Sequence, residues 1–312
     1  MRKMILELRG GLGNQLFQYQ LAQHIAKKNG LEFTISPQFT DESYNFKKYD
    51  DRTGLTKSGF YHYEKIIKIQ SKPDYFNILE NKKRVLRRKC GIEISDPPNQ
   101  NYTGFLNQNF SKVRYINGFF QTSLFLNHNQ LQEDYNRYVT GKQIRYQVSN
   151  YRTHKNSYLN YKFNMNSTRD KLAIHIRGSD YLKMGNTLGN LNYQYFLNAL
   201  AIFNLKDISA IIIFTDDISW AKKIMLAVEE KYHRLKAIKL YIYKSAGNDL
   251  DSFYLLSSFE NIIISNSTFS WWASYFNRID KLVIAPTKWY RNSPYCPSLI
   301  ENGFHLIKSV WI

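Results

Sequence analysis

A chain of 312 residues is long enough for two domains, and its 43% hydrophobic and 22% charged residues exclude an intrinsically disordered protein. Only two cysteines, Cys90 and Cys296, are present, which excludes a disulfide framework and favours a reducing compartment. The formal net charge of +18 predicts an anionic partner, which could be a phosphorylated substrate, a nucleic acid or an anionic lipid surface.

The amino-terminal segment does not look like a signal peptide, because its apolar run is broken at Glu7 and Arg9. No segment approaches the roughly 18 apolar residues of a membrane span. The basic cluster at 82–89 fits a solvated helix face, with Val85 and Leu86 turned inward, as well as it fits a membrane-surface patch. We therefore expect a cytoplasmic protein, with peripheral contact at the inner face of the cell membrane as an open alternative.

A strand, a glycine loop, a helix and a second strand are predicted at the start of the chain. The strands cover 4–8 and 31–35, and the helix covers about 14–28, with an apolar side chain at every fourth position. Asn29-Gly30 predicts the end of the helix. The loop Gly10-Gly11-Leu12-Gly13 lacks the third glycine of a dinucleotide fingerprint and the lysine of a P-loop.

The glycine loop still allows backbone to approach a ligand. A helix N-terminus favours negative charge, so Gly11, Gly13 and Asn14 are candidates for contact with a phosphate. A tight turn in which Asn14 simply caps the helix is the alternative.

The middle of the chain is polar and carries few periodic apolar positions. A strand running into a turn is predicted at 116–122. We place the domain boundary near the end of the polar stretch, which divides the chain into 1–165 and 166–312.

Strands and helices alternate in the second part, which predicts a parallel sheet with right-handed crossovers. The predicted strands are 172–176, 208–214, 237–243, 261–265 and 282–285. The predicted helices are 193–204, 219–232 and 250–259.

Three of these strands end in polar residues, which are Arg177, Asp216 and Ser267. Ligands of open α/β sheets bind outside the carboxyl ends of the strands. Arg177 is the first candidate, because a guanidinium offers a planar fork of donors to phosphate and keeps its charge. The alternative is an ion pair with Asp180 in the same loop. Asp216 could accept from the edge of a guanine or cap the following helix.

Ser267 and Thr268 begin a turn into a helix, where hydroxyl and N–H groups make an anion site. Phe269 could stack on a base, whereas Trp271 and Trp272 are expected in the core.

Metal ligation is not expected. Asp249-x-Asp251 resembles an acidic metal pair, but it falls at a helix start, where acidic residues are favoured in any case. None of the seven histidines has the spacing of a zinc site.

Several of these segments together resemble glycosyltransferase family 11, the α-1,2-fucosyltransferases. His175-x-Arg177-x-x-Asp180-Tyr181 resembles the donor-binding motif of that family. The other matching segments, which occur in family order, are 10–19, 118–122, 214–217, 266–272 and 285–290.

The resemblance implies an α/β fold of the GT-B type, with two Rossmann-like domains facing across a cleft. The domain at 1–165 would lie on the acceptor side, and the domain at 166–312 would bind GDP-fucose. The implied reaction is an inverting, metal-independent transfer of L-fucose to a sugar hydroxyl, α-1,2 to galactose. The partners would be the nucleotide sugar and a glycan or lipid-linked saccharide of lipopolysaccharide or capsule, with no cofactor and no nucleic acid.

The resemblance also implies roles for individual residues. Arg177 would contact the diphosphate and Asn14 the phosphate and fucose, in the vicinity of Gly11 and Gly13. His175 and Asp216 would lie at the nucleoside, and the diphosphate and base would be surrounded by Ser267, Thr268 and Phe269. Asp180 is a candidate general base, because an inverting transfer benefits from deprotonation of the acceptor hydroxyl.

One departure from the family pattern concerns the donor motif. The family usually has two adjacent arginines followed by Gly and Asp, whereas this chain has Arg177-Gly178-Ser179-Asp180. Loss of one charged hydrogen bond would weaken donor binding by about 1.5–3 kcal/mol. Another nucleotide-deoxysugar donor is therefore an alternative to GDP-fucose. Lys183 is a candidate cation that could replace the missing arginine. Unchanged affinity for GDP-fucose in Lys183→Ala would reject this role.

A basic nucleic-acid-binding protein is the alternative from another class. The charge of +18 motivates it, but the basic residues are spread through the chain and form no recognition motif.

Overall fold

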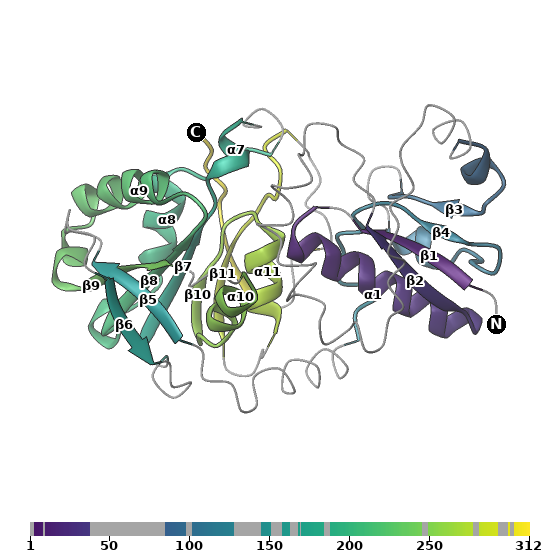
Figure 1. The fold of residues 1–312 in the computed structure, drawn as a ribbon. Coiled ribbons are helices and arrows are strands. Elements are labelled where there is room, and N and C mark those ends of the chain that lie inside the picture. The colour runs from purple at the N-terminus through teal and green to yellow at the C-terminus, as the bar shows by residue number, and fades with distance from the viewer. Residues whose placement is uncertain are drawn as a thin grey trace. The chain divides into compact units, whose positions relative to one another are not determined.

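The computed structural model describes residues 3–8, 10–37, 85–97, 102–127, 145–150, 158–162, 168, 170–183, 188–244, 249–276, 281–292, 299 and 303–312. The chain divides into two compact units, which are shown with their elements in Figure 1. Unit 1 comprises Met1–Asn129 and Pro297–Leu299, and unit 2 comprises Gln130–Cys296 and Ile300–Ile312.

Unit 1 is built on a parallel sheet with the strand order β2-β1-β4-β3. Its described elements are β1 (Lys3–Leu8), α1 (Leu12–Asn29), β2 (Glu32–Pro37), β3 (Glu93–Ile94), α5 (Tyr102–Leu106) and β4 (Tyr115–Ile116). Its core joins apolar side chains of the sheet and α1 to the aromatic rings of Tyr102, Phe105, Phe110 and Phe120.

The first βαβ motif is confirmed, with one correction at the start of its helix. α1 begins at Leu12, and the extended Gly11 is its N-cap, so the alternative in which Asn14 caps the helix is wrong. The reason is Gly10, whose φ of +68° turns the chain directly after β1 and lets the helix start early. At the other end, Gly30 forms the predicted left-handed cap and donates its N–H to the carbonyl of Ala26.

Unit 2 is built on an eight-stranded sheet with the order β12-β11-β10-β7-β8-β9-β5-β6. Its strands are β5 (Arg145–Asn150), β6 (Tyr158–Lys162), β7 (Lys171–Ile176), β8 (Ala210–Thr215), β9 (Lys239–Lys244), β10 (Asn261–Ile263), β11 (Leu282–Pro286) and β12 (Phe304–Ile307). Its helices are α7 (Ser179–Lys183), α8 (Tyr193–Leu200), α9 (Ile218–Lys231), α10 (Asp249–Ser257) and α11 (Thr268–Tyr275), and two 3-10 turns, η4 (Leu205–Asp207) and η5 (His233–Ala237), complete the unit.

Strands from β12 to β9 run parallel, and β5 joins β9 in the antiparallel direction. Since β6 then pairs with β5, residues 145–150 and 158–162 extend the sheet of unit 2, and their expected assignment to an N-terminal domain is wrong. The two strands are polar, so their sequence carries no sign of the long-range pairing that places them at this edge.

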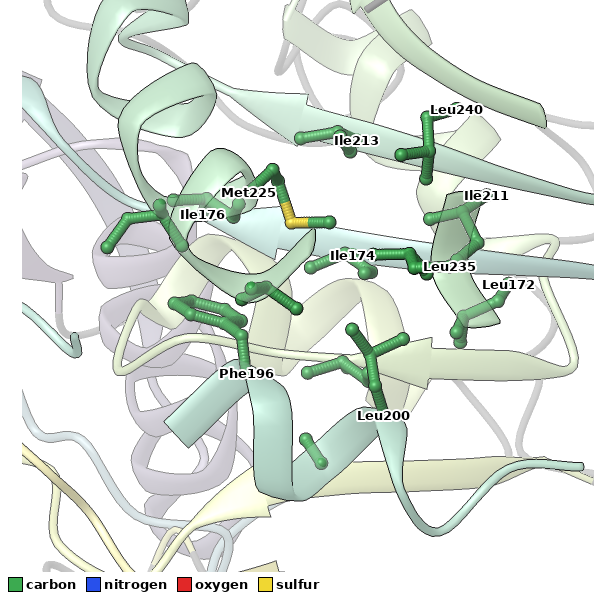
Figure 2. Close-up of a cluster of buried hydrophobic side chains, with 14 of the residues drawn as sticks. Leu172, Ile174, Ile176, Phe196, Leu200, Ile211, Ile213, Met225, Leu235 and Leu240 are labelled. Carbon is green, nitrogen blue, oxygen red and sulfur yellow. The ribbon is translucent and has the colours of Figure 1, made fainter. Parts of the chain in front are cut away.

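The core of unit 2 surrounds the central strands (Figure 2). Leu172, Ile174 and Ile176 of β7 are fully buried and lie beside apolar side chains of α8 and α9, among them Phe196 and Met225. Burial of a strand on both faces is typical of a parallel sheet covered by helices, which is why β7 reads as a near-continuous apolar run. The GT-B-type α/β fold class, with two Rossmann-like domains, is thus confirmed. None of the helices described is long and apolar enough to cross a membrane.

The helical segment 85–89 differs from its predicted orientation. Val85 and Leu86 are 55% and 64% exposed, so the expectation that they turn inward is wrong. The Nε groups of Arg87 and Arg88 instead lie 3.0 Å and 3.2 Å from the buried carboxylate of Glu93. The buried carboxylate draws the two arginines toward the sheet, because a buried charge requires a partner. Residues 82–84 lie outside the described part of the chain.

Candidate functional site

The carboxyl ends of β7 and β8 are joined by Asp216. Its Oδ2 lies 3.0 Å from Nη1 of Arg177, and its Oδ1 accepts the backbone N–H of Gly178 at 2.8 Å. The two strands are neighbours in the sheet, with Ile176 opposite Thr215. Asp216 is therefore an ion-pair partner of the guanidinium, because strand pairing brings it to the arginine. The alternative ion pair with Asp180 stays a prediction, since the side chain of Asp180 lies outside the described part of the chain.

The helix after β8 is capped by the next residue. Asp217 accepts the backbone N–H of Trp220 at 2.9 Å and is the N-cap of α9. The alternative in which Asp216 caps this helix is thus wrong, and the Asp216 carboxylate serves to connect two strands. Its predicted contact with a guanine stays a prediction.

Arg177 is held on two sides and remains accessible. Its side chain is 27% exposed, and its guanidinium carbon lies 5.1 Å from the ring centroid of Tyr181. A cation over an aromatic face is favourable, and the ion pair with Asp216 fixes the direction of the fork. Arg177 is therefore a fixed positive group at the end of β7.

His175 lies in the adjacent interior. Its Nδ1 is 2.8 Å from Oγ of Ser265, and its ring centroid is 5.7 Å from that of Phe269 on α11. Burial, together with the nearby charge of Arg177, lowers the pKa of His175 from 6.5 to about 3. The imidazole is therefore neutral at physiological pH.

The N-terminus of α11 follows the end of β10. Ser267 is its N-cap, is buried and makes no capping hydrogen bond through its side chain, while the half-buried Thr268 begins the helix. Phe269 extends toward His175, so the structure brings these predicted residues to the same edge of the sheet as Arg177. Trp271 and Trp272 are fully buried, as predicted.

Asn266 is a residue of this region that sequence reasoning missed. Its Nδ2 lies 3.2 Å, 3.1 Å and 3.0 Å from the carbonyl oxygens of Leu188, Gly189 and Trp289. One buried amide thereby connects the loops after α7 and β11 to the start of α11. The position of Asn266, a polar residue between a buried strand and a helix, could have indicated a structural role. Its hydrogen-bond partners could not be predicted, because they are far away in the sequence.

The close packing around Gly178 accounts for the absence of the second arginine at this position. A Cβ at this position would lie 2.6 Å from Cβ of Asp217 and 3.1 Å from Cδ1 of Trp220, so a larger residue would displace the first turn of α9. The next residue, Ser179, adopts a φ of +36° at the position where the family pattern has glycine, and its Oγ donates to the carbonyl of Asp216 at 3.0 Å. Asp180 and Lys183 lie in α7, and their side chains are outside the described part of the structure.

In unit 1, the predicted phosphate loop is organised around two amides. Oδ1 of Asn14 accepts from Nε2 of Gln121 at 2.8 Å, and Nε2 of Gln15 donates to the carbonyl of Gly10 at 2.6 Å. The amide of Asn14 lies against Gly10, where a Cβ would clash with it. Gly11 has open space around it, and Gly13 is buried inside α1.

Asp96 organises the loop that carries Gln121. Its Oδ2 accepts the N–H of Phe119 at 2.7 Å, and its Oδ1 accepts the N–H of Phe120 at 2.6 Å and the hydroxyl of Tyr102 at 2.9 Å. Asp96 was not predicted as a site residue. The prolines after it signalled only a loop, because its hydrogen-bond partners lie in a different segment.

Within the residues described, no group of three His, Cys, Asp or Glu side chains could hold a metal ion. Asp249 begins α10, as predicted for an acidic residue at a helix start, and its side chain is outside the description.

Two Escherichia coli proteins are similar to this chain in sequence. The O-antigen biosynthesis glycosyltransferase WbnK of Escherichia coli is 26% identical over 317 residues, which cover 96% of this chain and 99% of WbnK. An alpha-1,2-colitosyltransferase of Escherichia coli is 26% identical over 149 residues, or 46% of this chain and 47% of that protein.

Solved structures with a similar arrangement include the NodZ alpha-1,6-fucosyltransferase co-crystallised with GDP, with 13% identity and a TM-score of 0.40 over 87% of this chain and 91% of NodZ. The ADP-heptose lipopolysaccharide heptosyltransferase II of E. coli has 9% identity and a TM-score of 0.44 over 98% of this chain and 90% of that chain. The family model of glycosyl transferase family 11 matches residues 3–302. This match spans nearly the whole chain, and the protein therefore belongs to glycosyl transferase family 11.

Proposed function

We propose that this glycosyltransferase moves L-fucose from GDP-fucose, with inversion and without a metal ion, onto a galactose hydroxyl of a surface glycan in α-1,2 linkage. The observation that carries the proposal is the cluster at the end of β7. There, Arg177 is fixed by Asp216 beside the neutral His175 and the ring of Phe269. This combination of a permanent cation and an aromatic face suits a nucleoside diphosphate.

The chemistry of the transfer needs charge stabilisation at the leaving diphosphate. Arg177 supplies a positive group whose orientation is already set by the 3.0 Å ion pair with Asp216, so little reorganisation is needed during the reaction. The N–H groups at the start of α11, after Ser267, add a second favourable field. His175 contributes hydrogen bonding without a further charge, because its pKa of about 3 keeps it neutral.

The acceptor hydroxyl must lose its proton as the new bond forms. We propose Asp180, at the start of α7, as the general base. Substitution by asparagine keeps the shape of the side chain and removes its basicity. A full rate in Asp180→Asn would exclude this role.

A second candidate function is the transfer of another deoxysugar from its nucleotide. Two observations favour it. One relative is named an alpha-1,2-colitosyltransferase, and Gly178 leaves this chain with one arginine where the family pattern has two. Gly178 packs against Asp217 and Trp220, so the local fold leaves no space for a second arginine side chain at this position.

A lipid-linked acceptor would place the enzyme at the inner face of the cell membrane. The net charge of +18 and the exposed Val85 and Leu86 support peripheral binding to anionic lipid. Sedimentation with anionic vesicles at low salt, and release at high salt, is the expected result. Absence of sedimentation at low salt would reject membrane contact.

A donor and acceptor screen tests the function. Purified protein is incubated with GDP-fucose or GDP-colitose and with a panel of β-galactosides, and the linkage of each product is determined by NMR. The leading proposal predicts GDP release that depends on both GDP-fucose and a galactoside, with an α-1,2 product. Turnover with GDP-colitose alone would establish the second candidate. Salt-dependent binding to random RNA, without nucleotide-sugar binding, would instead favour a nucleic-acid-binding protein.

A further inference from the structure

The loop after β4 holds an unfavourable backbone conformation. Phe120 has a φ of +50°, in the left-handed region that bulky residues rarely adopt. Its side chain is nevertheless fully buried, with its ring centroid 5.8 Å from that of Phe105. Such a conformation persists only where its surroundings hold it, and it is common at ligand-binding loops.

Asp96 and Gly118 provide these surroundings. The Asp96 carboxylate binds the consecutive N–H groups of Phe119 and Phe120, at 2.7 Å and 2.6 Å, and is itself held by the hydroxyl of Tyr102. Gly118 lets the loop come this close, because a Cβ there would lie 2.9 Å from the backbone nitrogen of Asp96 and 2.7 Å from its Oδ2. The loop is therefore held rigidly.

The rigid loop carries the exposed ring of Phe119, and hydrogen bonds to Asp96 and Asn14 hold its backbone and the nearby Gln121. Phe119 is 41% exposed, although its N–H is bound to Asp96. On the other side of the buried Phe120, Gln121 donates to Asn14 at 2.8 Å and thereby joins the loop to the glycine turn after β1. β4 is the direct neighbour of β1, so both segments lie at the carboxyl edge of the same sheet.

The chemistry of this surface matches a neutral sugar. A single exposed aromatic residue is ordinary, but Phe119 directly precedes the strained Phe120 and lies two residues before Gln121, whose amide binds Asn14. Stability alone does not explain this combination. The face of an aromatic ring packs against apolar C–H groups, and amides bind hydroxyl groups. The residues from 117 to 122 carry no charge, so this loop favours a neutral ligand over a phosphate.

We propose that residues 118–122 form the acceptor-sugar subsite, with Phe119 as the platform for the apolar face of a galactose-like ring. This inference rests on the proposed transfer to a sugar hydroxyl. It does not depend on the identity of the transferred sugar.

Substitution of Phe119 tests the subsite. Phe119→Ala should raise the acceptor KM about tenfold, which corresponds to about 1.4 kcal/mol, and leave the donor KM unchanged. Phe119→Tyr, which keeps the ring, should stay within about twofold of the natural protein in both constants. Leu124→Ala is the matched control, because Leu124 is 49% exposed and lies shortly after the loop. If Phe119→Ala does not fold, Phe119→Leu, which keeps an apolar side chain without a ring, replaces it.

The donor for these assays is whichever nucleotide sugar the natural protein turns over. Failure with GDP-fucose would then reject the proposed donor without affecting the comparison of Phe119 variants. An unchanged acceptor KM in Phe119→Ala would overturn the subsite. An equal rise of the acceptor KM in Leu124→Ala would also overturn it, because the effect would not be specific to the loop.

Discussion

The carboxyl edges of the two sheets are built from different chemical groups. In unit 2, an arginine and an aspartate form an ion pair beside a buried, neutral histidine. In unit 1, amides and backbone groups meet, and the carboxylate of Asp96 holds the loop. A fixed positive charge suits a leaving diphosphate, whereas amides and an aromatic ring suit an uncharged sugar. The two edges thus favour different parts of one reaction.

The largest expected effect tests the charged edge. Arg177→Ala should lower kcat/KM by about 100- to 1,000-fold, or about 2.7–4 kcal/mol, because it removes the positive group at the leaving diphosphate. Arg177→Lys should recover only part of this loss, since an ammonium lacks the planar fork. Steady-state kinetics with a saturating acceptor measures both. Arg234→Ala, which changes an exposed arginine of unit 2, is the control. If Arg177→Ala kept activity within threefold of the natural protein, the charged edge of the sheet of unit 2 would have no special role at the leaving diphosphate.

The next effect concerns the space beside Arg177. Gly178→Ala should lower the free energy of unfolding by about 1–3 kcal/mol, because the new Cβ would lie 2.6 Å from Cβ of Asp217. Gly178→Arg, which restores the family's second arginine, should lose stability without gaining donor affinity. Urea unfolding and GDP titration measure the two quantities. Gly11→Ala is the matched control for the unfolding measurement, since a Cβ there meets nothing within 4 Å. Tighter GDP binding by a stable Gly178→Arg protein would contradict this account.

The buried histidine makes stability depend on pH. The pKa of His175 is about 3 in the folded protein and near 6.5 when unfolded, so the unfolded state binds the additional proton between these values. Its contribution to stability is complete above about pH 6.5 and is lost progressively as the pH falls toward 3, at about 1.4 kcal/mol per pH unit. Urea unfolding from pH 7 to pH 5 should therefore show a smaller slope in His175→Gln than in the natural protein. His233→Gln, at an exposed position, is the control. Identical slopes in the natural protein and His175→Gln would show that the buried ring is not responsible.

The smallest expected effect tests the neutral edge. Gln121→Ala removes the 2.8 Å hydrogen bond to Asn14 and should raise the acceptor KM about two- to tenfold, or about 0.5–1.5 kcal/mol. Gln23→Ala removes a comparable bond to the hydroxyl of Tyr19 on α1 and should leave the acceptor KM unchanged. Equal effects of the two substitutions would mean that Gln121 acts only through the stability of unit 1.

Much of the fold could be predicted because it depends on local pattern. The apolar runs of β7 and β8 are buried on both faces, and Gly30 ends α1 with the left-handed conformation that only glycine adopts easily. The order of the motifs led to the family, which the match over residues 3–302 confirms. The predicted site residues of unit 2 come from three strand ends, and a parallel sheet necessarily places such ends at one edge.

The sequence by itself thus determined the family, the two parallel sheets and the edge at which the polar residues gather, because periodicity and strand direction are local properties. The tertiary structure decided which groups meet there. It paired Arg177 with Asp216, gave Asn14 the distant Gln121 as its partner and filled the space beside Gly178. It also added β5 and β6 to the second sheet. These contacts join segments that are far apart in the chain, and their free energies depend on neighbours that no local pattern identifies.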